Sequence, residues 1–199
     1  MASQGQFRDA DDAVSLNGSS DQGFFPRDKG DGKYLISALH NVEDVERYEL
    51  GGFHPVHIGD HFCGKRYKVI HKLGAGGFST VWLARDMELS RYVSLKVVSA
   101  DASKECQDKE LEVYRCIQQD SMLSTHPGRN FISSPLDHFW FDGPNGSHIC
   151  LVFQVLGPSM ARFSCLQCRP RKGVDRKTSW QVTQGLAYLH SLGICHGGT

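Results

Sequence analysis

A cluster of glycines between two strand-like runs is the feature that most constrains how this chain can fold. Residues 67–70 are Tyr-Lys-Val-Ile, residues 74–77 are Gly-Ala-Gly-Gly, and residues 79–84 are Ser-Thr-Val-Trp-Leu-Ala. A strand, a glycine-rich turn and a second strand predict a β-hairpin. Backbone N–H groups of such a turn can approach phosphate oxygens because no Cβ stands in the way, although a flexible hairpin tip accounts for the same residues. The pattern does not fit a dinucleotide-binding unit, in which the glycines open into a helix.

Apolar periodicity in the rest of the chain predicts an α+β fold. Further strands are expected over residues 92–98, 132–141 and 148–156, and helices over residues 103–118 and 178–192. Composition divides the chain into three parts. Residues 1–43 are expected to be a disordered tail, because Gly, Ser, Asp and Gln dominate residues 1–33 without a sustained apolar period. Residues 44–157 hold the hairpin and most strands, and residues 158–199 hold the second helix.

Charge and cysteine content narrow the class of protein. Lys+Arg 22 and Asp+Glu 22 give a formal net charge of zero, so the total charge favours neither nucleic acid nor an anionic membrane as a partner. Seven irregularly spaced cysteines and no apolar leader predict reduced thiols in a cytoplasmic and/or nuclear protein. No apolar run has the length of a membrane span.

Two alternative functions rest on short patterns. Cys165 and Cys168 have the spacing of a zinc-ligand pair, but no second pair with clean spacing follows, so no metal site is expected. A basic stretch over residues 162–177 would suit nucleic acid, yet it lacks interleaved aromatic residues, and a solvated linker is the favoured interpretation.

Lys96 is the first residue with a chemical role to explain. It lies in the run Val-Ser-Leu-Lys-Val-Val at 93–98, one strand length after the hairpin. A Lys in a buried strand needs a counter-charge, and from this position an ammonium group can reach nucleotide phosphates. An outward-facing Lys on an alternating strand is the other interpretation.

The expected helix over 103–118, with Ser103 as a candidate N-cap, offers two carboxylates for Lys96. Glu112 is expected to be the partner, because it lies among the apolar residues Val113, Cys116 and Ile117. Glu110 is the competitor and points to a different side of the helix.

Together these motifs resemble the nucleotide-binding lobe (N-lobe) of a protein kinase. The resemblance rests on Leu-Gly-Ala-Gly-Gly-Phe-Ser-Thr-Val at 73–81, Val-Ser-Leu-Lys at 93–96, Glu112, and Ile-Cys-Leu-Val-Phe-Gln-Val-Leu-Gly at 149–157. The stretch Tyr-Glu-Leu-Gly-Gly-Phe-His-Pro-Val-His-Ile-Gly-Asp at 48–60 is similar to the corresponding segment of the SR-protein kinases. The resemblance implies an antiparallel sheet with one regulatory helix and only the first helices of the C-lobe. It also implies ATP as phosphoryl donor, protein Ser/Thr as acceptor, and Arg/Ser-rich splicing factors as usual substrates.

The resemblance also assigns roles to residues. The loop over the phosphates would comprise Leu73, Gly74, Ala75, Gly76, Gly77, Phe78, Ser79, Thr80 and Val81. Lys96 would contact the phosphates and Glu112 would fix its head group. Phe153 would be the gatekeeper, and Gln154 to Leu156 the hinge beside adenine. Ser79 replaces the third glycine, and Gln154 stands where an acid is usual, but hinge contacts are made by backbone groups, so nucleotide binding should survive.

The pattern fails where the catalytic loop should begin. By the resemblance, His196 matches the His of a His-x-Asp motif, and Gly198 stands where the catalytic Asp belongs. Losing such a group typically costs about 10²–10⁴-fold in rate. The Asp-Phe-Gly motif that binds Mg²⁺ in the family is absent from the 199 residues. We therefore expect a chain truncated at the catalytic loop and impaired in catalysis.

A non-catalytic, pseudokinase-like interaction module is the alternative to a truncated enzyme. A truncated enzyme would leave Val182, Leu186 and Leu189, on one face of the second helix, without a partner surface. Such a stripe favours aggregation, whereas an interaction module would be stable and soluble.

Overall fold

The computed structural model describes residues 43–121, 125–157, 159 and 172–195. The expected tail therefore lies outside the described residues except for Glu43. Cys165 and Cys168 also lie outside them.

Six strands form one antiparallel sheet in the order β1-β2-β3-β4-β6-β5. Their bounds are β1 His61–Phe62, β2 Tyr67–Gly76, β3 Ser79–Asp86, β4 Arg91–Val98, β5 Asp137–Gly143 and β6 Gly146–Gln154. The predicted hairpin is β2–β3, in which Gly76 pairs with Ser79 beside the turn. The strand expected from residue 132 begins only at Asp137, after Pro135, because Pro has no N–H for a strand ladder.

The central strand β4 is covered on both faces, which makes it a rigid base for a site. Val93, Leu95 and Val97 belong to a core with Val56 and Phe62 of the segment that precedes β2. The opposite face carries Val98, which packs in a second core with residues of the long helix and β6. Lys96 belongs to this helix-facing side, since side chains alternate along a strand.

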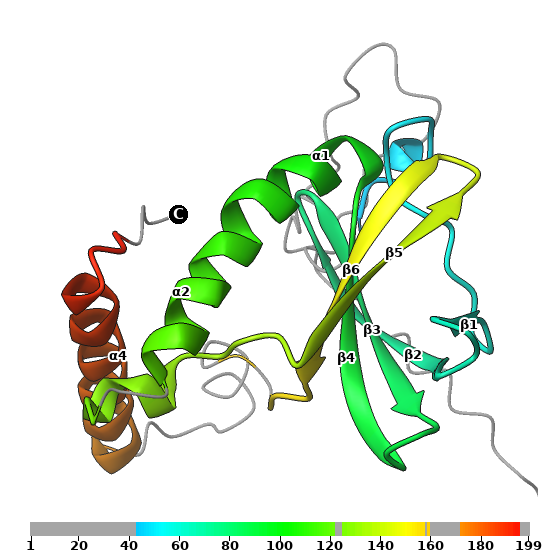
Figure 1. Ribbon diagram of the computed structural model, residues 1–199. Coiled ribbons are helices and arrows are strands. Elements are labelled where there is room, and N and C mark those ends of the chain that lie inside the picture. The colour runs from blue at the N-terminus through cyan, green and yellow to red at the C-terminus, as the bar shows by residue number, and fades with distance from the viewer. Residues whose placement is uncertain (1–42, 122–124, 158, 160–171, 196–199) are drawn as a thin grey trace, which may run out of the picture.

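The predicted helix is longer than expected and contains a wide turn. It consists of α1 (Ala100–Glu105), a π-helical turn η2 (Cys106–Glu110) and α2 (Leu111–Ser121), and it runs diagonally beside the sheet (Figure 1). The expectation that Ser103 caps it is wrong, because Ser99 is the N-cap residue. The Ser103 hydroxyl donates to Ser99 O at 2.7 Å and accepts the Ile149 N–H at 3.0 Å, which ties the helix to β6.

The remaining described helices are short or peripheral: η1 (Val45–Arg47), η3 (Pro127–Phe131) and α4 (Lys172–Ser191). α4 lies beside the C-terminal end of α2 (Figure 1), and the Tyr188 hydroxyl donates to Asp120 at 2.8 Å. Of the predicted apolar stripe on this helix, Val182 (64%) and Leu186 (40%) are exposed, whereas Leu189 is half-buried. Within the described ranges, no helix has the length and apolar character needed to cross a membrane.

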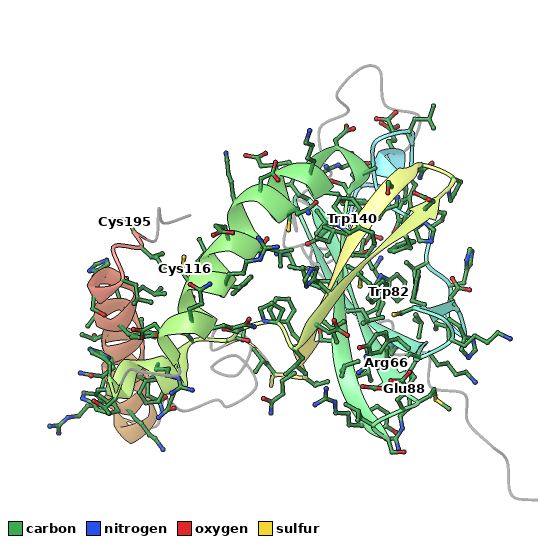
Figure 2. The ribbon with its side chains drawn as sticks, in the orientation of Figure 1. Arg66, Trp82, Glu88, Cys116, Trp140 and Cys195 are labelled. Carbon is green, nitrogen blue, oxygen red and sulfur yellow. The ribbon has the colours of Figure 1, made fainter. Side chains whose placement is uncertain are left out.

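A charged cluster closes the end of the sheet that lies far from the glycine-rich turn. The Asp86 side chain is fully buried and accepts two hydrogen bonds of 3.2 Å from the Arg66 guanidinium. Arg66 also lies 3.2 Å from Glu88, and Figure 2 shows these two residues together. Burial raises the pKa of Asp86, but the Arg66 hydrogen bonds outweigh it and lower this pKa overall.

Candidate functional site

A cavity of about 590 Å³ opens between the glycine-rich hairpin, β4 and the segment that follows β6. This volume falls within the usual range of ligand pockets, about 300–1,000 Å³. Six of its lining residues were predicted from the sequence: Leu73, Val81, Lys96, Phe153, Gln154 and Leu156. Residues from four separate stretches of sequence therefore meet in one pocket.

Strand register explains why these side chains meet. Val81 of β3 is the direct cross-strand partner of Lys96 on β4, and Phe153 of β6 is the partner of Ser94 on β4. Directly paired residues project to the same face of an antiparallel sheet. The pocket thus has apolar walls and one cation, an arrangement suited to a flat apolar group joined to an anionic group.

The glycines of the hairpin are not required by the fold of the chain itself. A Cβ added at Gly74 or Gly77 would meet no atom within 4 Å. Neither residue has the positive φ that favours glycine. The open space leaves room for a ligand to approach the backbone of the loop closely, which phosphate binding by such a loop needs.

Other predicted loop residues differ in where their side chains lie. Thr80 is fully buried, and its hydroxyl accepts a hydrogen bond of 3.0 Å from the Trp82 indole, so its side chain belongs to the core. Ala75 pairs with Thr80 across the hairpin. Phe78 is 68% exposed at the tip, and with Ser79 it lines a second cavity of about 270 Å³.

Lys96 forms an ion pair with Glu110, and the expectation that Glu112 is its partner is wrong. The Lys96 ammonium donates to the two Glu110 carboxylate oxygens at 2.7 and 3.0 Å. Glu112 instead accepts from Arg115 at 2.9 Å on the exposed side of the helix. The Lys96–Glu110 pair lies between the two cavities, since Lys96 lines both and Glu110 lines the smaller one.

The error came from choosing the wrong face of the helix. Val113 is 37% exposed, Cys116 is exposed too, and Figure 2 shows Cys116 on the side of α2 away from the sheet. Ile117 is buried, seven residues after Glu110. Counting back from Ile117 by seven, a helical repeat of two turns, is the signal that would have selected Glu110.

Two further groups on the same face hold the Glu110 carboxylate. The Cys106 thiol donates to it at 3.2 Å and the Tyr114 hydroxyl at 3.3 Å. Burial raises the pKa of Glu110, but the hydrogen bond and charge of Lys96 lower it more, so the carboxylate stays ionised. Burial, followed by contact with Glu110, raises the pKa of the Cys106 thiol to about 12, so Cys106 remains a donor.

Sequence reasoning missed two polar residues of the larger cavity, Ser94 and Ser133. Ser94 is 9% exposed and lies two residues before Lys96, hence on the same face of β4. The alternation of the strand was the available signal. Ser133 lies in the connection before β5, and no pattern in the sequence marks it.

The catalytic-loop positions, His196 and Gly198, lie outside the described residues. Among the residues that the structure does describe, no group of three or more His, Cys, Asp or Glu side chains could hold a metal ion. The described site therefore supplies a cation and an open backbone loop to a ligand.

A family model described as "Protein kinase domain" matches residues 67–197. The chain belongs to the protein kinase family. This family uses ATP as phosphoryl donor, typically with Mg²⁺. The six-stranded sheet and its long helix correspond to the expected N-lobe, with only part of a C-lobe after it.

Individual relatives confirm the resemblance to SR-protein kinases. The chain is 40% identical over 173 residues to protein kinase dsk1 of Schizosaccharomyces pombe, covering 83% of this chain and 31% of that protein. It is 41% identical over 153 residues to human SRSF protein kinase 3, covering 75% and 26%. It is 35% identical over 163 residues to serine/threonine-protein kinase SKY1 of Saccharomyces cerevisiae, covering 78% and 22%. The chain thus spans less than a third of the length of these kinases.

Proposed function

We propose that this chain provides the ATP-binding lobe of a serine/threonine protein kinase of the SR-protein kinase type. The observation that carries the proposal is the Lys96–Glu110 ion pair at the boundary of a 590 Å³ cavity beneath the glycine-rich hairpin. The pair needs both strand β4 and the long helix in place, so it fixes the ammonium group at the end of the pocket.

Each part of ATP has a suitable partner in this cavity. The apolar side chains of Leu73, Val81 and Phe153 offer surface for the adenine ring. Backbone groups of residues 154–156 can hydrogen-bond to the edge of the ring. The Lys96 ammonium and the N–H groups of the loop can neutralise the phosphates. Mg²⁺, when bound with ATP, would neutralise further phosphate charge, and the described residues hold no cluster of three or more candidate ligands for it.

Phosphoryl transfer needs groups beyond this lobe. Gly198 has no carboxylate to orient a substrate hydroxyl or to accept its proton. We therefore propose that the 199-residue chain by itself binds ATP and transfers phosphate slowly. Arg/Ser-rich proteins are the proposed acceptors, because the chain resembles the SR-protein kinases and one similar relative is named SRSF protein kinase 3. The proposed location is the cytoplasm and/or nucleus.

Thermal melting with and without Mg-ATP tests nucleotide binding. A ligand at 100 times its Kd stabilises the folded state by about 2.7 kcal/mol, so the melting temperature of the wild-type chain should rise by several degrees. Lys96→Met should abolish most of this rise, because the phosphates lose their cation. The matched control is Lys104→Met, since Lys104 is an exposed lysine on α1. No rise for the wild-type chain, or an equal rise for both variants, would contradict the proposal.

A non-catalytic interaction module remains the second candidate function, and the glycine at position 198 favours it. Incubating the purified chain with labelled ATP and an Arg/Ser-rich peptide separates the two. Transfer at a rate typical of kinases would refute slow transfer. ATP-dependent stabilisation with slow transfer is the expected result for the lobe alone, whereas no transfer at all would favour the interaction module.

A further inference from the structure

The segment before the sheet reaches over the tip of the glycine-rich loop. Arg47, the last residue of η1, donates a hydrogen bond from Nη1 to the Gly77 carbonyl oxygen. Its guanidinium also lies 5.6 Å from the centre of the Phe78 ring at the same tip. A residue 30 positions earlier in the sequence thus contacts both the backbone and a side chain of the loop.

Arg47 is itself held in place. Its guanidinium lies 4.5 Å from the centre of the buried Phe53 ring, and its carbonyl accepts the Phe53 N–H at 2.7 Å. The Phe53 carbonyl accepts from the Asn145 amide at 2.6 Å. The base of the contact is therefore fixed to the β5–β6 turn.

The same segment is fixed to the start of the long helix. Ala100 and Asp101 donate their N–H groups to the carbonyls of Gly52 and Gly51 at 3.0 and 2.8 Å. Gly52 has no room for a Cβ, because the Arg47 carbonyl occupies that space. The segment that carries Arg47 is therefore hydrogen-bonded to the start of α1.

The loop tip has little else to hold it. Phe78 is 68% exposed, and its carbonyl accepts the Ser99 N–H at 2.9 Å as a continuation of the sheet ladder. Within the described part of the chain, Arg47 supplies the one side-chain hydrogen bond to the backbone of residues 74–78. Beyond the ladder, the position of the tip depends on this guanidinium.

We propose that Arg47 is a positioning residue that holds the glycine-rich loop in place for the phosphates of the bound nucleotide. This proposal rests on the proposed ATP site. A loop ordered before binding loses less conformational freedom when the ligand arrives. Losing one net hydrogen bond corresponds to about a two- to tenfold change in affinity. The loss of affinity should be larger for ligands that carry phosphates, because Arg47 contacts the loop tip and does not line the larger cavity.

Binding of ATP, ADP and adenosine is measured by titration calorimetry for the wild-type chain, Arg47→Met, Arg47→Lys and the control Arg115→Met. Arg115 is an exposed arginine in a surface ion pair on α2. Arg47→Met should weaken ATP and ADP about two- to tenfold and adenosine less than about twofold. Arg47→Lys keeps a cationic donor and should restore most of the affinity. Unchanged ATP affinity for Arg47→Met, or an equal loss for adenosine, would overturn the proposal.

Hydrogen exchange without nucleotide separates positioning from simple charge attraction. The amides of Phe78 and Gly77 should exchange faster in Arg47→Met than in the wild-type chain, and Arg115→Met should leave them unchanged. A loss of ATP affinity with unchanged exchange would assign the effect to charge and overturn positioning. If the wild-type chain binds no ATP, the proposed function fails, while the exchange measurement still tests the Arg47 contact.

Discussion

Replacing Glu110 with Gln tests whether Glu110, and not Glu112, supplies the counter-charge of Lys96. Glutamine keeps the shape of the side chain and one acceptor oxygen, and it removes the negative charge. Glu112→Gln is the matched control, because Glu112 lies two residues away on the same helix and pairs only at the surface with Arg115. The two variants make the same chemical change, but Glu110 is more buried and also accepts hydrogen bonds from Cys106 and Tyr114.

The exposure of the pair sets the expected magnitude. The Lys96 and Glu110 side chains are 29% and 33% exposed. Exposed ion pairs contribute about 0.2–1 kcal/mol, whereas removing one partner of a buried pair costs about 3–5 kcal/mol. Glu110→Gln should therefore lower the free energy of unfolding by roughly 1–2 kcal/mol, between these limits. Glu112→Gln should lower it by less than about 0.5 kcal/mol.

Urea denaturation at two pH values is the assay. Because the pKa of Glu110 is lowered in the folded chain, its stabilisation is present above the ordinary carboxyl pKa of 4.5 and is lost as the pH falls through the lowered pKa. The difference between wild type and Glu110→Gln should be largest near neutral pH and shrink in acid. A larger cost for Glu112→Gln, or a Glu110→Gln cost that does not depend on pH, would refute the assigned pairing.

Two other substitutions, at His54 and at Asp86, test interactions away from the larger cavity. Burial and, next, the charge of neighbouring His148 lower the pKa of His54 to about 4. As the pH falls, the unfolded chain therefore binds a proton at this residue before the folded chain does. The free energy of unfolding should be at its full value above about pH 6.5 and should be lower by roughly 1–2 kcal/mol at pH 5. Urea denaturation should show this slope in the wild-type chain and a weaker one in His54→Leu, and equal slopes would contradict it. Asp86→Ala leaves the Arg66 guanidinium without its buried partner and should cost about 2–4 kcal/mol in the same assay; a cost below about 1 kcal/mol would show that solvent replaces the carboxylate.

Much of the fold and of the pocket followed from local signals in the sequence. The glycine-rich turn, the alternation of β4 and the apolar run of β6 each act within a few residues, so their elements were predicted. Val81 and Lys96 then fell into one pocket because a short connection sets the register of β3 and β4, and Phe153 joins them because β6 pairs directly with β4. The pairing of Lys96 was predicted wrongly, because it depends on the rotation of a helix about its own axis.

The π-helical turn made that rotation harder to predict, although the seven-residue spacing from Glu110 to the buried Ile117 was an available signal. The Leu111 N–H bonds to the Cys106 carbonyl, five residues back, and this spacing adds one residue to the turn. No residue between 106 and 110 is a glycine or proline that would mark the turn in the sequence. The Arg47–Gly77 contact escaped prediction for another reason, since 30 residues separate its partners and no periodic pattern links them.

The wide turn makes the length of this stretch matter more than its composition. Upstream of it, Ser103 is fixed to the backbone of β6, and downstream of it Ile117 is buried. One residue of α-helix corresponds to a rotation of about 100°. Deleting a single residue there would give a more regular helix and yet turn one half away from its partner. Evolution can therefore exchange the exposed side chains of residues 107–109 more freely than it can add or remove a residue.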